Sequence, residues 1–355
     1  MISKAEKMLT ELVLIRSAEN DSMQPVTNYV TKVMKELGMH VRNYGSKDNP
    51  AMIGQFMENG VMLSGHLDTV PIGTTGWTKK QGEMIDGVLY GRGTGDMKGG
   101  CVAMLLAAEE MVKAKTPFSL CFTTDEETSM AGAAAASIDP AVKNAPAVMV
   151  TEATDFDIVI REKGLVQFEI CTDGKSAHAS MPHLGENAIV KMVDLLQKMK
   201  DLQIPPEDPV EHMTLTVDVI RGGTATNVIP AECVVEVDVR YPPEMNTSAV
   251  LDEVRKRIGD DGYEIKILHE LDPVGTDPSI EAVTTLKEVI GPDTKVLAVP
   301  YATEMVMFKS ANDKLMICGP GDPTSCHIPD EWIKVEDVAK AARIYADYCA
   351  KMAGL

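Results

Sequence analysis

The sequence has little of what marks secreted, membrane-spanning or nucleic-acid-binding chains. No apolar run approaches the roughly 20 residues that a membrane-spanning helix needs. Residues 1–16 mix charged side chains with leucines and do not form the apolar core of a signal peptide. Basic residues are in the minority, since 34 Lys and Arg stand against 53 Asp and Glu for a formal net charge of −19. This charge argues against nucleic acid and anionic membrane surfaces as partners.

Other absences concern redox chemistry and nucleotide cofactors. None of the seven cysteines forms a C-x-x-C pair, so we expect reduced thiols in the core and a cytoplasmic protein. The glycine-rich stretch Gly91–Gly100 has neither the G-x-G-x-x-G spacing nor a G-K-[ST] ending, which makes phosphate binding a poor interpretation. The chain also has no fixed-period repeat and no low-complexity linker.

What the sequence does contain is an alternation of apolar strands and helices. Its 355 residues suffice for two domains. Strands predicted at Val61–Gly65, Phe118–Thr123 and Ala147–Val150 alternate with helices, including an apolar one at Met97–Lys113. Such an alternation produces a mainly parallel sheet covered on both faces. The predicted fold class is therefore α/β, with a three-layer αβα domain formed by residues 1–162 and 273–355.

Residues 163–272, between these two segments, follow a different order. The predicted elements run strand, helix, strand, strand, helix, strand, which is the order of a ferredoxin-like α+β domain. We interpret this segment as a separate domain inserted into the first. Pairing of exposed strand edges between two such inserts would produce a homodimer.

Acidic side chains and imidazoles follow the predicted buried strands of the first domain. Functional sites of parallel α/β sheets form outside the carboxyl ends of the strands, so these side chains are expected near one another. So many carboxylates in one place need cations to neutralise them, and imidazole with carboxylate suits zinc and similar ions. The residues concerned, together with two in loops that can reach the same edge, are His66, Asp68, Glu126, Glu127, Glu152, Asp96 and His327.

The ligand set predicted from these residues is dinuclear. A carboxylate has two oxygens and can bridge two ions, and Asp96, at the end of its tight turn, is the predicted bridge. His66 and Glu152 would complete one metal site, and Glu127 and His327 the other. The predicted cofactor is two divalent ions, with zinc as the first choice and cobalt and manganese as alternatives.

Two carboxylates remain for other roles. Asp68 is two residues from His66, where it could accept the second N–H of that imidazole. Glu126 is next to a predicted ligand but points elsewhere, so it is the predicted general base and later the acid for the leaving amine. Taken one at a time these residues have ordinary explanations, namely a helix cap for Asp96, a turn residue for Asp68 and a solvated pair for Glu126 and Glu127. The joint pattern favours the metal site.

Four segments together carry a family resemblance: Ser64–Pro71, Tyr90–Gly100, Thr124–Glu127 and Gly174–Ser180. They resemble the zinc amidohydrolases grouped with acetylornithine deacetylase, succinyl-diaminopimelate desuccinylase, aminoacylase and carboxypeptidase G. The resemblance extends over effectively the whole chain. It implies the same five metal ligands and the same catalytic pair, and an α/β catalytic domain with an inserted dimerisation or lid domain.

The resemblance also implies roles for residues of the insert. His178 matches a lid histidine that, in relatives, reaches the partner subunit's active site and helps to hold the oxyanion. Asn227 and Arg240 match positions that hold the substrate's carboxylate or backbone, and Arg is the natural bidentate partner of a carboxylate. On its alternating strand, Arg240 could equally be a solvated surface residue. Cys326, beside His327, could be an auxiliary thiolate ligand, but five ligands are already present.

Two further segments bear on the branch of the family. Tyr301–Glu304 and Gly319–Glu331 look more like the acetylornithine deacetylase branch, whereas Pro323–Cys326 within the second departs from both branches. The predicted function is hydrolysis of the amide of an N-acyl amino acid, of the acetylornithine or acetyl-lysine type, in amino-acid biosynthesis. Water would be activated by a di-zinc centre with Glu126 as general base.

Three alternatives remain open. The first is an N-succinyl amino acid as substrate, as for succinyl-diaminopimelate desuccinylase, and the second is a dipeptidase or carboxypeptidase with the same centre and a longer pocket. The third is a non-catalytic relative that only binds metal, which is disfavoured because the predicted base and all ligands are present.

Overall fold

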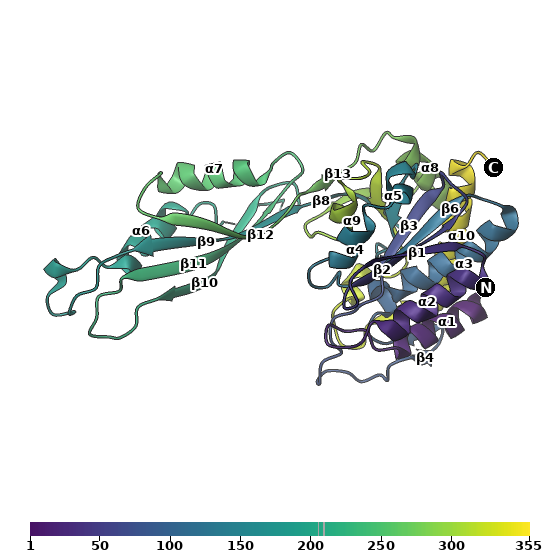
Figure 1. Cartoon of the computed structure of the whole chain (residues 1–355), viewed down its shortest axis with the longest axis horizontal. Helices are drawn as coiled ribbons and strands as arrows, with labels where there is room; N and C mark the ends of the chain where they lie inside the picture. The colour runs from purple at the N-terminus through teal and green to yellow at the C-terminus, as the bar shows by residue number, and fades with distance from the viewer. Residues whose placement is uncertain (205, 209) are drawn as a thin grey trace. The chain divides into compact units, whose positions relative to one another are not determined.

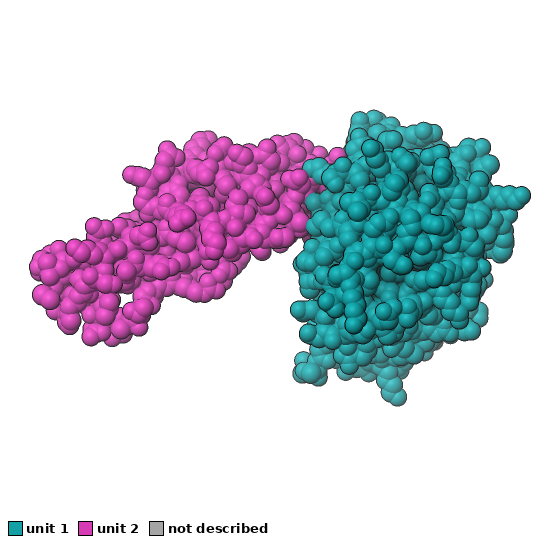
Figure 2. Space-filling view, viewed as in Figure 1, with its two compact units in different colours: residues 1–160, 276–297, 303–355 teal, residues 161–275, 298–302 magenta. Residues whose placement is uncertain are grey.

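The structure is a computed structural model that describes residues 1–204, 206–208 and 210–355 of the chain. The chain divides into two compact units, each with its own apolar core (Figure 2). The first unit consists of Met1–Ile160, Thr276–Leu297 and Thr303–Leu355. The second consists of Arg161–Gly275 and Ala298–Ala302.

The largest sheet has the strand order β1-β2-β6-β3-β7-β15-β8-β13, in which β14 also pairs with β8. Its strands belong to the first unit, except for β13 and the last residues of β8 and β14, which the division assigns to the second. The four central strands β6, β3, β7 and β15 run parallel, and the flanking pairs of β1, β2, β8 and β13 are antiparallel. The strands are β1 (His40–Gly45), β2 (Pro50–Phe56), β3 (Val61–His66), β6 (Phe118–Thr123), β7 (Val148–Val150), β8 (Ile158–Glu162), β13 (Val274–Gly275), β14 (Val296–Val299) and β15 (Leu315–Ile317).

The central strands are buried at every position, because they are mostly apolar and have neighbours on both sides in the sheet. Five helices of this unit, α1, α2, α3, α8 and α10, share one apolar core, and α4 packs on β1, β2 and β6. The helices are α1 (Ile2–Leu14), α2 (Gln24–Glu36), α3 (Gly99–Ala114), α4 (Ala131–Ala136), α5 (Pro140–Asn144), α8 (Glu281–Ile290), α9 (Met305–Phe308) and α10 (Val335–Met352).

The apolar helix predicted at Met97–Lys113 begins two residues later, at Gly99. A short helical turn, η1 (Thr94–Lys98), precedes it, and the backbone of Asp96 within this turn is extended, with φ −120° and ψ 96°. The irregular turn therefore separates Asp96 from the helix proper.

A small three-stranded sheet, which sequence periodicity did not predict, consists of β4 (Glu83–Ile85), β5 (Val88–Tyr90) and β16 (Trp332–Lys334). Strands of three residues are too short to show an alternating pattern. In this sheet Trp332 pairs with Tyr90, which brings the end of the C-terminal loop beside the start of the glycine-rich turn.

The second unit is an antiparallel four-stranded sheet of order β10-β11-β9-β12 with two helices on one face (Figure 1). Alternate residues of β9 and β11 are buried, and they form one core with the apolar faces of the helices. The elements are β9 (Gly164–Asp173), α6 (Ala188–Lys198), β10 (Thr214–Gly222), β11 (Glu232–Tyr241), α7 (Thr247–Ile258) and β12 (Glu264–Leu271), with the short turn η2 (Pro182–Leu184) before α6.

These observations confirm the predicted fold class, a mainly parallel α/β sheet accompanied by a ferredoxin-like α+β insert. Within the described ranges, no helix combines the length and the apolar character that crossing a membrane requires.

Candidate metal centre

Three of the predicted ligands leave the carboxyl ends of adjacent parallel strands. His66 is the last residue of β3, Glu127 follows β6, and Glu152 follows β7. The strand order β6-β3-β7 puts the three ends side by side, and His66 is in register with Thr123 at the end of β6. The sheet therefore collects side chains that are up to 86 residues apart in the sequence, counted from position 66 to position 152.

The fourth ligand, Asp96, depends on the glycines around it. Gly93 adopts φ +82°, a left-handed conformation that favours glycine. A Cβ atom at Gly100 would lie 2.1 Å from the carbonyl oxygen of Thr151, which directly precedes Glu152. The absence of side chains at these two positions thus lets the turn and the start of α3 lie close to the strand ends.

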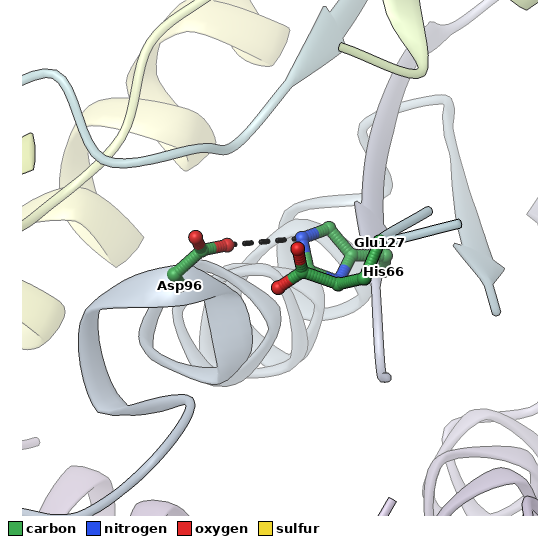
Figure 3. Close-up of side chains that lie close together, drawn as sticks. All are labelled: His66, Asp96 and Glu127. Carbon is green, nitrogen blue, oxygen red and sulfur yellow. Dashed lines mark hydrogen bonds and ion pairs between the residues drawn. The ribbon is translucent and has the colours of Figure 1, made fainter. Parts of the chain in front are cut away.

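The carboxylate of Asp96 lies between two imidazoles. Its Oδ1 atom is 3.1 Å from Nε2 of His66 (Figure 3), and its Oδ2 atom is 3.0 Å from Nε2 of His327. Each imidazole nitrogen also faces a second carboxylate: Oε1 of Glu152 is 3.0 Å from His66, and Oε2 of Glu127 is 3.2 Å from His327. The contacts thus form two sets of three side chains that share Asp96, which is the grouping predicted for a bridged pair of ions.

The donor set and its spacing fit divalent metal ions. Donor atoms of His66, Asp96 and Glu127 all lie within 4.8 Å of one another. Ligands at about 2.0–2.1 Å from a tetrahedral zinc ion would be about 3.3 Å apart, close to the observed contacts. Burial raises the pKa of the Cys326 thiol, which disfavours the thiolate alternative.

The electrostatics of the cluster also favour cations. Burial raises the pKa of Glu152 to about 8, with the charge of Asp96 adding to the effect. Burial likewise raises the pKa of Glu126 well above its ordinary value, and the charges of Glu152, Asp96 and Glu127 contribute. Hydrogen bonds to Asp96 and Glu127 raise the pKa of His327 to about 10. The carboxylates therefore repel one another unless protons or metal ions neutralise them.

Asp68 orients His66 through its main chain. Nδ1 of His66 is 3.0 Å from the backbone carbonyl oxygen of Asp68 and 3.5 Å from its carboxylate Oδ1. The other carboxylate oxygen accepts the backbone N–H of Glu127 at 3.1 Å. The nearer acceptor of the imidazole proton is therefore the carbonyl rather than the predicted carboxylate. Either acceptor keeps the proton on Nδ1 and leaves Nε2 free for an ion.

A small cavity of about 80 Å³ adjoins the centre in the first unit. Of the described residues that line it, none is Lys or Arg. Its acidic lining residues are Glu19, Asp48, Asp68, Asp125 and Glu127.

Two buried carboxylates near the centre had no role predicted from the sequence. Glu304 accepts a hydrogen bond from Oγ of Ser64 at 2.6 Å and another from Oγ1 of Thr123, so it links the ends of β3 and β6. Glu331 contacts the turn that carries Asp96. Both lie in segments that bore on the family branch, but no pattern of spacing could have revealed their contacts.

The three predicted residues of the insert all belong to the second unit. His178 pairs with Val228 in an isolated bridge, and the backbone N–H of Ala179 donates to the carbonyl of Asn227 at 2.9 Å, so His178 and Asn227 lie side by side. The backbone N–H of Ser180 donates to Nδ1 of His178 at 3.2 Å, which leaves the Nε2–H of a neutral ring free to donate.

Arg240 lies elsewhere in the same unit. Asn227 precedes β11, whereas Arg240 is near the other end of this strand. The eight residues from Glu232 to Arg240 span about 26 Å. Its guanidinium donates to Oδ1 of Asp238 at 2.9 Å and to Oδ2 at 3.3 Å. The second unit therefore brings His178 and Asn227 together but holds Arg240 apart from them.

Imidazoles and carboxylates gathered at the carboxyl ends of parallel strands are typical of metal-dependent hydrolases. Residues 62–351 match the model of peptidase family M20/M25/M40. This chain belongs to that family.

The similar proteins include two curated relatives and a solved structure. The chain is 32% identical over 302 residues to the acetylornithine deacetylase of Shigella sonnei, covering 80% of this chain and 78% of that protein. It is 27% identical over 388 residues to a "Probable succinyl-diaminopimelate desuccinylase" of Staphylococcus epidermidis, covering 96% of each. The YXEP protein of Bacillus subtilis, described as a dinuclear metal binding peptidase from M20 family, superposes with a TM-score of 0.75 at 15% identity, covering 99% of this chain and 98% of that one.

Membership of the family confirms two predictions. The resemblance to the deacetylase and desuccinylase group is correct, and the chain is a hydrolase that acts on amide bonds. The relatives differ in their substrates, and identities of 27% and 32% do not decide between them. What they share is the hydrolysis of an amide bond.

Proposed function

We propose that this protein hydrolyses the amide bond of an N-acyl amino acid with two divalent metal ions, zinc as the first choice. The observation that carries the proposal is that the two oxygens of the Asp96 carboxylate face different imidazoles. One oxygen lies 3.1 Å from His66 and the other 3.0 Å from His327. An aspartate in this position would hold both ions, one through each carboxylate oxygen. The dinuclear relative from Bacillus subtilis supports the same number of ions.

When bound, the two ions lower the pKa of a water molecule and polarise the substrate's carbonyl group. Glu126 removes a proton from that water as its oxygen attacks the carbonyl carbon, and it then gives the proton to the amine nitrogen as the C–N bond breaks. Among the described residues, none of the short contacts between the candidate ligands uses the carboxylate of Glu126, which leaves it available for this transfer. The products are the free acid and the free amino group.

The second unit supplies the remaining groups in this proposal. Nε2–H of His178 donates to the carbonyl oxygen as negative charge develops on it, and its proton is available because Nδ1 accepts from Ser180. Asn227 and Arg240 hold the amino-acid end of the substrate. His178 pairs with Val228, which precedes β11, whereas Arg240 is near the other end of that strand, about 26 Å along it from Glu232, so one copy of the unit does not offer both to a small substrate. A homodimer, in which the two residues at one site come from different subunits, would remove this difficulty.

Exposed apolar side chains on the second unit support dimerisation through it. They occur in the loop before α6, on the outer face of α6 and on the edge strand β10. A second copy is the proposed cover for this surface, since water-exposed apolar groups of this kind mark interaction sites. The residues are Met181, Leu184, Val190, Val193 and Ile220. The free thiols of all seven cysteines fit the proposed cytoplasmic location.

For the substrate, we favour an N-acetyl diamino acid such as acetylornithine or acetyl-lysine. The cavity beside the centre is lined by Glu19, Asp48 and Asp125 in addition to two residues of the centre itself, with no Lys or Arg among its described lining. Such a lining attracts an amino group and repels the free carboxylate of a succinyl group. An N-succinyl amino acid is therefore the second candidate and a short peptide the third.

A substrate panel tests the proposal. Metal-free protein is assayed with added zinc, cobalt or manganese on Nα-acetylornithine, on its uncharged counterpart Nα-acetylnorvaline, on an N-succinyl amino acid and on dipeptides. We expect the highest kcat/KM for Nα-acetylornithine, with acetylnorvaline at least tenfold lower. Equal rates for the two acetyl compounds would remove the cationic preference. A higher rate on the succinyl compound would replace the first candidate with the second.

A further inference from the structure

The carboxylate of Glu331 is fully buried yet does not point at a metal position. One of its oxygens, Oε1, accepts the backbone N–H groups of Gly95 at 3.0 Å and Asp96 at 3.2 Å. The other, Oε2, accepts a hydrogen bond from the guanidinium of Arg92, whose side chain is also buried. The Glu331 side chain has no exposed surface. Both ends of the glycine-rich turn, Arg92 and Asp96, are thus attached to one carboxylate.

The same residue is only four positions after His327, so it also anchors the loop that carries this imidazole. The backbone carbonyl of Glu331 accepts the N–H of Gly91 at 2.9 Å, and Trp332 pairs with Tyr90 between β16 and β5. Side chain and main chain of Glu331 therefore join the His327 loop to the Asp96 turn directly. The other ligand candidates are held differently: His66 and Glu152 by the strands β3 and β7, and Glu127 by its backbone N–H, which donates to Asp68.

The contacts of Glu331 are energetically coupled. A buried carboxylate is strongly unfavourable unless it is paired and hydrogen-bonded, and here two N–H groups and one guanidinium satisfy it. Arg92 in turn lies over the ring of Trp77, with 5.4 Å from its guanidinium carbon to the ring centroid. A movement of the turn away from the loop would break several of these interactions at once, so the two segments keep a fixed spacing.

We propose that Glu331 is a positioning residue that sets the distance between Asp96 and His327, and so the geometry of the second metal position. This inference rests on the proposed dinuclear function. An ion held by Asp96, Glu127 and His327 would depend on Glu331 through two of its three ligands. An ion held by His66, Glu152 and Asp96 would depend on it through one.

The neighbouring residue provides a matched control. Asp330 accepts the backbone N–H groups of Thr78 at 2.7 Å and Lys79 at 2.9 Å, and its other oxygen accepts the hydroxyl of Thr78 at 2.6 Å. It therefore anchors the same loop with a similar set of bonds, but to a segment that carries no ligand. Glu331→Gln and Asp330→Asn make the same change of charge one residue apart.

The experiment titrates cobalt(II) into metal-free wild type, Glu331→Gln and Asp330→Asn, with the visible absorption of cobalt and the spin coupling of the ion pair as readouts. In Glu331→Gln we expect the first ion to bind within about threefold of wild type, and the second to bind about 10- to 100-fold more weakly, the range seen when outer hydrogen bonds to ligands are removed. The spin coupling between the two cobalt ions should also weaken in Glu331→Gln. Asp330→Asn should match wild type in both steps.

The wild-type curve and the variant curves answer different questions. If wild type binds only one ion, the proposed dinuclear function fails, and the inference fails with it. If wild type binds two and Glu331→Gln also binds two with unchanged affinities, only the positioning role is refuted. Equal weakening in Asp330→Asn would refute it too, since that loss would come from the loop as a whole.

The double variant Arg92→Gln with Glu331→Gln covers the case in which Glu331→Gln does not fold. It removes both buried charges, so no unpaired guanidinium remains. We expect it to fold and to show the same selective loss of the second ion. Normal binding of both ions by the double variant would overturn the inference.

Discussion

The replacement Glu126→Gln tests the proposed base most directly. The amide has the size of the carboxylate but cannot take up a proton at neutral pH. Glu126 makes none of the short contacts that tie the five candidate ligands together, so the ligand set remains intact in the variant. We therefore expect normal metal content and a collapse of turnover.

The magnitude follows from the role. A positioned general acid or base contributes typically 10²- to 10⁴-fold to the rate. At about 1.36 kcal/mol for each factor of ten, kcat should fall by the equivalent of about 2.7–5.4 kcal/mol. KM should change little, because the binding residues and the ions are untouched.

Although turnover falls, the thermal stability of the metal-free protein should stay the same or rise in Glu126→Gln. Burial raises the pKa of Glu126 well above its ordinary value, and neighbouring carboxylates contribute. Because the folded-state pKa exceeds that of the unfolded chain, ionised Glu126 destabilises the metal-free protein at pH values above the unfolded pKa, about 4.3. Glutamine stays neutral and removes this cost. Metal-free Glu126→Gln should thus melt at the same temperature as wild type or higher at pH 7, and the difference should vanish toward pH 4.

Three measurements decide the outcome: metal content by elemental analysis, steady-state kinetics on the best substrate, and thermal unfolding followed by circular dichroism. Glu127→Gln is the matched control, since it makes the same change at the adjacent residue, whose carboxylate is 3.2 Å from His327. The control should lose an ion as well as activity. Retained turnover in Glu126→Gln, or loss of metal equal to that in the control, would refute the assignment of Glu126 as the base.

Three further predictions follow from the remaining contacts. Asp96→Asn should lose both ions together in equilibrium dialysis, whereas retention of one would mean that another residue bridges. His178→Ala should reduce turnover, and mixing it with Asp96→Asn should restore one working site in each heterodimer; failure to recover would argue against action across subunits. Asp139→Asn should lower the free energy of unfolding in urea by about 2–4 kcal/mol, because Asp139 is buried and accepts from Arg42 at 2.6 and 2.8 Å. Although burial opposes it, the Arg42 hydrogen bond lowers the pKa of Asp139, so this stabilisation is present above about pH 4 and is lost as the pH falls further; a constant difference down to pH 2.5 would contradict the reasoning.

Much of the first unit could be predicted because its buried strands are recognisable in the sequence as short apolar runs. β3 and β6 are buried at every position and mostly apolar, as buried parallel strands are, and an acidic residue follows two positions after each of them ends, Asp68 and Asp125. The rule that sites form at the carboxyl ends of such strands then predicted which side chains meet. The small sheet of β4, β5 and β16 escaped prediction because three residues show no periodicity.

The sequence by itself determined which side chains gather at the centre, since His66, Glu127 and Glu152 each follow a buried strand of a mainly parallel sheet, whose carboxyl ends lie along one edge. Only the tertiary structure decided how they are held. The contacts of Glu331 with Asp96 and of Glu304 with Ser64 join segments more than 200 residues apart, and no local pattern encodes such pairs. The placement of His178 beside Asn227, beyond the opposite end of β11 from Arg240, likewise emerged only when the strands were paired. Local sequence sets the conformation and polarity of each segment, whereas the packing of the whole chain sets the distances between them.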